Sequence, residues 1–318
     1  MTAPTNTVTS LTAIGQRESL SDIIYRVAPE DTPFFSMIKK EKAKARAEEW
    51  QTESLRTPVA TNYQLEGDDV GTVVAGNTSV RVKNYCQIFR ESGAVSETAN
   101  EVDLAGRKSE MARQKSLKGL EIRTDVEMSF LSNNASREES GADARVSGGI
   151  QAWLTTNTDR GSGGSDGGYS AGIAAAATTG TNRAFSEAQV KSIMASVYDA
   201  GGKVSVCMVD SAHKQDFSAF SGIADIRAEV KGQDQATLYA AADVYVSDFG
   251  SVSIVPHRYA LSEEALFITP SMASVKVLRG FKTKALAKSG DNDKFLMTYE
   301  ATLCVKNEKA HGIVADLS

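Results

Sequence analysis

The chain has 318 residues, of which 41% are hydrophobic and 24% charged, and its formal net charge at pH 7 is -5. This composition excludes collagen-like, disulfide-scaffold and disordered proteins, and the acidic balance argues against a dedicated nucleic-acid-binding protein, whose domain would be basic. No apolar run approaches the roughly 18 residues of a membrane span, and the opening MTAPTNTVTSL lacks the pattern of a secretory signal. The three widely spaced cysteines are expected to be reduced thiols.

The first fifty residues are expected to form a loose arm followed by helices. Residues 1–18 are rich in Thr, Ser and Ala without sustained periodicity, so we expect either a functional arm or a frayed terminus. The apolar spacing from residue 20 to residue 27 predicts a helix that Pro29 ends. Thr32 and Pro33 predict a second, short helix capped by the Thr32 hydroxyl. The mixed charges that follow indicate a solvated face.

A long segment of unusual composition comes next. From Trp50 to Ser79 the sequence has few bulky apolar residues, and from Val80 to Ile88 it alternates in a way that predicts a strand. A weakly apolar excursion of about 30 residues is hard to place inside a compact domain. We therefore expect an extended β-hairpin that reaches for a partner, with a disordered surface loop as the alternative.

The middle of the chain predicts a long helix and then a glycine-rich break. Residues 104–133 contain no proline, and apolar side chains fall on two opposite sides of their second half. This pattern predicts a helix about 45 Å long with material packed on both sides. The run RGSGGSDGGYSAG, at residues 160–172, is expected to be a flexible boundary.

The remainder of the chain mixes helices and strands. Ser186 and Gln189 form a capping box that begins a helix, and a strand and a short helix over residues 210–220 are predicted after it. The final part is mostly strand, and its strongest signal is the apolar alternation over residues 295–305. The predicted fold class is therefore α+β.

No active-site motif lies in the context that its chemistry needs. The histidines are isolated from one another and from cysteine, so no zinc site is predicted, and no phosphate-binding or dinucleotide-binding loop is found. Gly163 to Gly167 spells G-x-S-x-G, but the strand and helix that would make Ser165 a nucleophile are not predicted around it. We predict no catalytic, cofactor-binding or metal site, with a serine hydrolase that uses Ser165 as a weaker alternative.

Several stretches, taken in their order along the chain, resemble a known family. They are LSDIIYRVAPEDTPFFSMI, EEWQTESLRTP with EGDD, NYCQIFRESGAVSETANEVDLAGRKSEMARQKSLKGLEIRTDVE, GIQAWLTTN, VYVSDFGSVSIVPHR, LRGFKTKALAKSGDNDKF and EATLCVKNEKAHGIVADL. The sequence resembles the major capsid proteins of tailed bacteriophages with the Hong Kong 97-type fold, in the podovirus-type subfamily. The resemblance spans nearly the whole chain after residue 18.

The resemblance implies an organisation that can be placed on this sequence. It implies an N-terminal arm (1–18), a helical segment of the peripheral domain (19–49), an extended loop built as a β-hairpin (50–85), the peripheral domain (86–184) with a spine helix (104–133), an axial domain (185–256), and C-terminal strands that return to the peripheral domain (257–318).

The resemblance also implies a function. Subunits would self-assemble into hexamers and pentamers of an icosahedral or elongated capsid, built in the host bacterial cytoplasm and present in the virion. Double-stranded DNA would be contained rather than tightly bound, because the net charge is negative and acidic residues dilute the cations from Arg107 to Lys118. Portal, scaffold and decoration proteins are further possible partners, and no membrane is expected. A cargo-holding nanocompartment shell and a phage tail or neck component are alternatives.

Candidate contacts between subunits lie on the extended loop. Aromatic residues concentrate interface energy, so Trp50 and Tyr63 are the expected anchors. Exposed charged pairs contribute only about 0–1 kcal/mol each, but a shell repeats each of them many times. The charged candidates are Arg56, Glu66, Asp68 and Asp69; a solvated loop tip is the alternative for them.

Some members of the wider fold cross-link covalently through a lysine of the extended loop. No lysine lies between Glu49 and Arg81 in this sequence, so we predict shells held without covalent bonds. Boiling assembled particles in detergent should give a single band of subunit size on a gel. A ladder of multimers that survives boiling would contradict this prediction.

Overall fold

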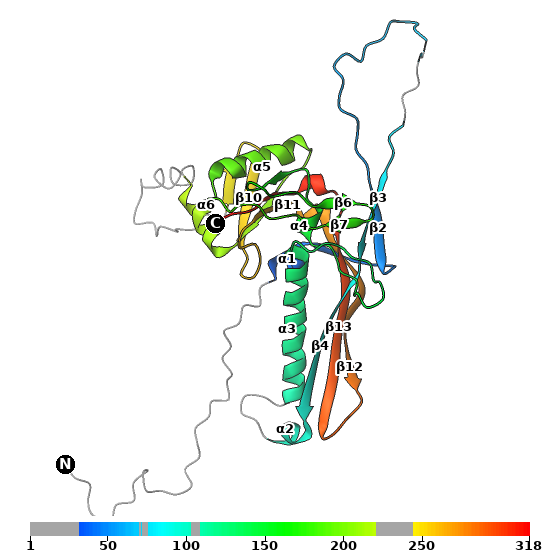
Figure 1. Cartoon of the computed structure of the whole chain (residues 1–318), viewed down its shortest axis with the longest axis vertical. Helices are drawn as coiled ribbons and strands as arrows, with labels where there is room; N and C mark the ends of the chain where they lie inside the picture. The colour runs from blue at the N-terminus through cyan, green and yellow to red at the C-terminus, as the bar shows by residue number, and fades with distance from the viewer. Residues whose placement is uncertain (1–31, 70, 72–75, 103–108, 221–243) are drawn as a thin grey trace, which may run out of the picture.

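The computed structural model describes residues 32–69, 71, 76–102, 109–220 and 244–318. The expected arm (1–18) and the helix predicted from residue 20 lie outside these residues. The described part holds a four-stranded sheet, a six-stranded sheet and two small two-stranded sheets. In Figure 1 the four-stranded sheet extends downward beside the long helix α3, while a long loop projects in the opposite direction.

The four-stranded sheet is the elongated part of the molecule. In spatial order its strands are β1 (Lys39–Lys42), β12 (Ala273–Leu286), β13 (Asn292–Val305) and β4 (Gln87–Ser96). β1 is parallel to β12 and the other neighbours are antiparallel. Every second residue of β13 from Phe295 to Val305 is buried, which confirms the strand predicted there.

The long helix α3 runs from Glu110 to Leu131 along one face of this sheet. The predicted start at Leu104 is wrong, because Ser109 has extended backbone and its side chain caps the helix by accepting a hydrogen bond from the Ala112 N–H. Residues 103–108 lie outside the description. Ile122 and its neighbours one turn apart are buried, whereas Leu117, Leu120 and Met128 on the other side are only partly covered. The expected packing on both sides is therefore incomplete in the single chain.

The charged run before residue 50 forms strands, so the expectation of a helical segment over residues 19–49 is wrong from residue 38 onward. The short helix α1 (Pro33–Met37) is followed at once by β1, and β2 (Ala47–Thr52) follows β1. The charged residues before residue 50, which the sequence indicated as a solvated face, include one that forms ion pairs along the sheet. The Glu41 carboxylate lies 2.7 Å from the Lys276 ammonium and 3.7 Å from that of Lys306.

The six-stranded sheet draws its strands from three separate regions of the sequence. Their spatial order is β5 (Thr158–Asp159), β14 (Gly312–Val314), β11 (Ala265–Ile268), β8 (Val206–Val209), β10 (Gly250–Pro256) and β9 (Val244–Ser247). Helices α5 (Glu187–Asp199) and α6 (Ser211–Ala219) pack on it. The capping box of Ser186 and Gln189 is present, which confirms that prediction.

The segment 257–318 does not return as a whole to the four-stranded sheet. β11 pairs with β8 and β14 pairs with β11, so both belong to the six-stranded sheet, and only β12 and β13 join the four-stranded one. All four residues of β11 are buried. A strand that is apolar on both faces needs cover on both sides, and a position inside the six-stranded sheet supplies it.

The glycine-rich run is packed rather than flexible. It forms a small hairpin of β6 (Gly168–Ser170) and β7 (Ile173–Ala175). A Cβ atom on Gly161 would lie 2.1 Å from the Thr181 carbonyl oxygen, and one on Gly167 would lie 2.3 Å from that of Ala175. These glycines are therefore needed for close approach of the backbone. The remaining short helices are α2 (Glu97–Glu101), α4 (Ile150–Trp153), η2 (Pro270–Met272) and η3 (Glu308–Ala310).

A buried carboxylate joins three distant parts of the chain. Glu127 of α3 is fully buried, and its two oxygens accept hydrogen bonds from the N–H groups of Phe34 (2.8 Å) and Phe35 (2.6 Å) at the start of α1. Glu127 therefore caps α1 in place of Thr32, whose hydroxyl makes no capping bond. The Nε2 atom of His257, just after β10, lies 3.2 Å from the same carboxylate.

The tautomer of His257 follows from its other contacts. Its Nδ1 atom accepts hydrogen bonds from the N–H groups of Tyr259 (3.3 Å) and Ala260 (3.0 Å). An accepting nitrogen carries no proton, so the ring proton is on Nε2 and faces Glu127.

Replacing Glu127 tests how much this junction contributes to stability. Glu127→Ala leaves two buried N–H groups without acceptors, so we expect a loss of about 3 kcal/mol or more in the free energy of unfolding. Urea denaturation of the unassembled subunit measures it. The matched control is Glu121→Ala on the exposed side of α3, expected to cost under about 0.5 kcal/mol. Equal losses for the two variants would contradict the role of Glu127.

Candidate inter-subunit surfaces

The loop between β2 and β3 stands on a regular two-stranded base. β2 pairs antiparallel with β3 (Val80–Tyr85), and the register places Trp50 opposite Val82 and Thr52 opposite Val80. In the described residues from 53 to 79 no strand pairing continues. Figure 1 shows this loop projecting away from both sheets. The expected hairpin is therefore a short ladder that carries an open loop.

The loop exposes large apolar side chains that its own subunit does not cover. The exposed fractions are 87% for Leu55, 79% for Tyr63 and 81% for Leu65. Scattered single apolar residues on a surface need no explanation, but exposed apolar surface that gathers on one part of a molecule, here a single projecting loop, is typical of an interaction site. The loop is therefore the first candidate surface for contact between subunits.

The charged candidates lie on the same loop. Glu66, Asp68 and Asp69 are exposed, and within the described part of the chain none of them forms an ion pair. The Arg56 guanidinium donates a hydrogen bond to the carbonyl oxygen of the adjacent Thr57 (3.2 Å) rather than to a carboxylate. All four charged groups thus remain open to a partner.

Trp50 occupies a different position from the other candidates. Its ring is half-buried and lies 5.3 Å, centroid to centroid, from that of Trp153, which in turn stacks on Tyr169 at 5.4 Å. Trp50 therefore anchors the base of the loop to its own subunit. This contact could not be predicted from local sequence patterns, because Trp153 lies far along the chain from Trp50. Contact between Trp50 and a neighbouring subunit stays a prediction, and it concerns only the exposed part of the Trp50 ring.

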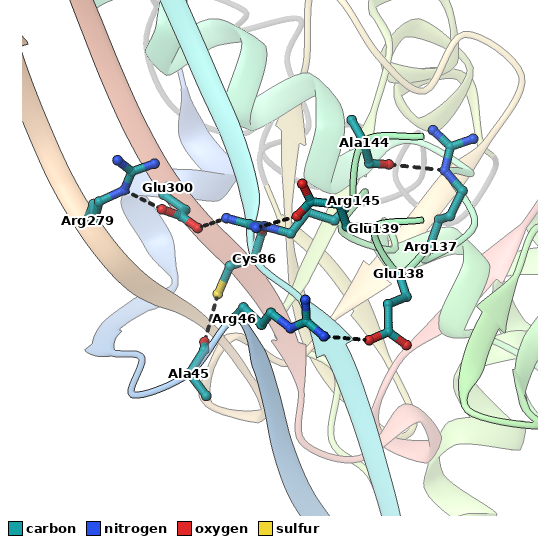
Figure 2. A network of polar contacts seen from close by, with 10 residues as sticks. All are labelled: Ala45, Arg46, Cys86, Arg137, Glu138, Glu139, Ala144, Arg145, Arg279 and Glu300. Carbon is teal, nitrogen blue, oxygen red and sulfur yellow. Dashed lines mark hydrogen bonds and ion pairs between the residues drawn. The ribbon is translucent and has the colours of Figure 1, made fainter. Parts of the chain in front are cut away.

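A polar network, which sequence reasoning missed, holds the loop base against the four-stranded sheet (Figure 2). The buried carboxylate of Glu300 on β13 pairs with the guanidinium groups of Arg145 and Arg279. Beside it, Arg46 pairs with Glu138 at 3.1 Å. Burial lowers the pKa of Arg145, but its hydrogen bonds to carboxylates outweigh this and hold the pKa above its ordinary value. Removing one member of such a buried pair leaves an uncompensated buried charge, which is strongly destabilising, so we expect the network to stabilise the region where the loop base joins the sheet.

The geometry around Ser165 does not support a hydrolase. Ser165 forms an isolated β-bridge with Thr178, and none of the three histidines, all within the described residues, hydrogen-bonds to it. Burial lowers the pKa of His311 to about 4, and its Nδ1 accepts a hydrogen bond from the Thr269 N–H. Across the described ranges there is also no group of three His, Cys, Asp or Glu placed to hold a metal, and no helix long and apolar enough to cross a membrane.

Solved structures share this architecture. A chain of Mycobacterium phage Bobi superposes with a TM-score of 0.60 at 10% identity, covering 95% of both chains. A chain from the capsid of a native GTA particle gives 0.61 at 12% identity, covering 97% of this chain and 98% of that one. An encapsulin, SrpI from Synechococcus elongatus PCC 7942, gives 0.59 at 9% identity, covering 96% and 93%. At these identities the likeness is one of fold, and the fold is Hong Kong 97-type.

The sequence comparisons define the family. The model of the SU10 major capsid protein family matches residues 3–318, and the chain belongs to this family. It is 26% identical over 331 residues to the major capsid protein of Escherichia phage Phieco32, covering 94% of each chain. The predicted fold class and the predicted function, a bacteriophage major capsid protein that forms part of the virion shell, are confirmed.

The three cysteine thiols are buried, which predicts that they are unreactive in the folded subunit. Burial raises the pKa of Cys86 to about 12 and that of Cys304 to about 11, and it also raises the pKa of Cys207. Since the thiolate is the reactive form, the folded subunit at pH 8 should not react with a thiol-specific reagent, and all three cysteines should react after denaturation. Ser54→Cys on the exposed loop is the positive control. Rapid labelling of the unaltered folded subunit would contradict this prediction.

Proposed function

We propose that this major capsid protein assembles into hexameric and pentameric capsomers in which the extended loop of each subunit (residues 50–85) lies over an adjacent subunit. The observation that supports this is the loop itself, which carries uncovered Leu55, Tyr63 and Leu65 on a rigidly held base. An interface stabilises an assembly only if the free energy gained from its contacts exceeds the free-energy cost of ordering the groups that make them. A base fixed by Trp50 and by the Glu300 network lowers that cost, because the loop is already positioned.

The other segments have proposed roles within the same shell. Residues 1–18 act as an arm that crosses onto a neighbour. The region 185–256 forms the axial domain, whose loops meet at the five-fold and six-fold centres, and β4, α3, β12 and β13 form the peripheral domain. The shell is icosahedral or elongated, is assembled in the host bacterial cytoplasm, and takes a portal and, where the phage encodes them, scaffold and decoration proteins as partners.

The shell contains double-stranded DNA without binding it tightly. The cations of α3 that could meet DNA are largely neutralised within the chain: Lys118 pairs with Glu91 at 3.1 Å and with Glu121 at 2.6 Å, and Arg113 pairs with Glu110 at 3.1 Å. Tight DNA binding needs several free cations that release counterions. The subunit's role is structural rather than enzymatic, and the isolated position of Ser165 supports this.

Shortening the loop tests the proposal. A variant in which residues 55–75 are replaced by a short Gly-Ser linker should keep the far-ultraviolet circular dichroism and melting behaviour of the unassembled subunit, because β2 and β3 remain paired. It should form no closed shells by negative-stain electron microscopy and light scattering, under conditions in which the unaltered chain does.

A full-length control separates loss of the side chains from loss of length. The triple variant Leu55→Ser, Tyr63→Ser and Leu65→Ser keeps the loop but removes its apolar surface, and it should reduce shell yield at least tenfold. Shells of normal size and yield from the shortened variant would refute the role of the loop.

A further inference from the structure

Three cations gather on the α3 side of the four-stranded sheet, at its edge strand β1. Alternate residues of a strand point to the same face, so Lys40 and Lys42 share one face of β1 and Glu41 points to the other. The Lys40 Nζ atom lies 4.1 Å from the ring centroid of Phe35, and the Arg123 guanidinium of α3 lies 5.7 Å from the same centroid. We call Lys40, Lys42 and Arg123 the basic cradle.

The basic cradle is held in position by the elements around it. In Figure 1, α1 lies beside the upper end of α3. Phe35 of α1 is buried, and its ring packs edge-on against that of Tyr299 with the centroids 6.2 Å apart. Arg123 also donates a hydrogen bond to the Ser36 hydroxyl (2.8 Å). A cation over a fixed aromatic ring keeps its place while its charged group stays accessible, so little ordering is needed when a ligand binds.

The charge of the basic cradle is not compensated by the described part of the chain. Glu127 lies one turn further along α3 from Arg123, at the spacing of an ion pair, but both of its oxygens accept N–H groups of α1. Glu41 points to the opposite face of β1, where it pairs with Lys276. None of the three cradle cations forms an ion pair with a described residue. Burial and the nearby Arg123 guanidinium lower the pKa of Lys40.

Uncompensated cations in this arrangement fit a row of phosphate groups. A guanidinium matches two oxygens of a phosphate, and an ammonium adds a charged hydrogen bond. Double-stranded DNA presents one negative charge about every 1.7 Å along its axis, so one duplex that lies across the cradle can contact all three cations. A single carboxylate of a protein partner would neutralise only one of them. Arg113 and Lys118 of α3 are already paired with glutamates, and Arg123 is not.

We infer that the basic cradle binds phosphate groups of the packaged double-stranded DNA, and that the α3 side of the subunit lines the interior of the shell. This rests on the proposed function and adds a specific point of contact to it. Three phosphate contacts give a slope of only about −2.7 in a plot of log K against log salt concentration. The contact made by one subunit is therefore weak and salt-sensitive, which agrees with a shell that holds DNA without binding it tightly.

Binding of a short fluorescent DNA duplex to the unassembled full-length subunit tests the inference. Fluorescence anisotropy at several salt concentrations measures the affinity and the salt slope. The neutral variant Lys40→Gln/Lys42→Gln/Arg123→Gln should bind at least tenfold more weakly at low salt, with a slope shallower by about 2 to 3. The charge-retaining variant Lys40→Arg/Lys42→Arg/Arg123→Lys should bind within about twofold of the unaltered chain. Circular dichroism and melting establish that each variant folds.

A matched control neutralises one arginine and two lysines on the opposite face of the same sheet, as Arg90→Gln/Lys282→Gln/Lys284→Gln. All three are exposed, and the register places Arg90 and Lys282 opposite the same residue, Thr298. The affinity of this control should stay within about twofold of the unaltered chain. Normal binding by the neutral variant overturns the inference, and so does equal weakening of the two variants.

A single substitution keeps the test decisive if the neutral variant does not fold. Lys42 is exposed, so Lys42→Glu is expected to leave the fold intact. It should make the salt slope shallower by about 1, and an unchanged slope would overturn the inference.

Labelling of assembled, DNA-filled particles tests which side of the subunit lines the interior. The native thiols are buried, so Lys42→Cys adds one accessible thiol. A maleimide coupled to a polymer too large to cross the shell should leave intact particles unlabelled and should label particles that have been opened and freed of DNA. Labelling of intact particles places the cradle outside, and no labelling after opening means that a neighbouring subunit covers it; either result overturns the inference. Failure of the proposed function is distinct, since the unaltered chain would then form no shells while duplex binding by the subunit could still be measured.

Discussion

The arrangement of this subunit depends on one buried carboxylate. Glu127 of α3 accepts the first two N–H groups of α1 and faces the Nε2 proton of His257 at the end of β10. A charged group without solvent is tolerable only when its lone pairs are satisfied, so the three elements must keep their positions together. The core confirms this coupling, because one hydrophobic cluster includes residues of α3, of the four-stranded sheet and of one face of the six-stranded sheet.

The junction formed by Glu127 connects parts of the subunit that extend to opposite ends of the molecule. The loop between β2 and β3 and the outer part of the β12–β13 hairpin lie far apart, at opposite ends of the molecule. The loop keeps apolar and acidic side chains exposed. A subunit with such a surface is suited to contact with neighbours of its own kind, in keeping with its membership of a capsid-protein family. The Glu300 network joins the chain after the loop to the four-stranded sheet, because Arg145 bonds both to Glu300 and to the carbonyl oxygen of Cys86.

The sequence predicted the elements whose signals are local. The alternation from Phe295 to Val305, the capping box of Ser186 and the sparse apolar content of the extended loop each follow from near neighbours in the chain. Long-range pairing was not predictable in this way. The segment of β1 was expected to lie in a helical region with a solvated charged face, because the partner of its Glu41, Lys276, lies far along the chain. The role of Glu127 was not predicted, because its partners precede and follow it by about a hundred residues.

The most direct test of the account is the structure of the assembled shell by electron cryo-microscopy at side-chain resolution. The account predicts that Leu55, Tyr63 and Leu65 of each subunit are buried against an adjacent subunit. A shell in which the loop extends into solvent, or in which it contacts only its own subunit, would contradict it.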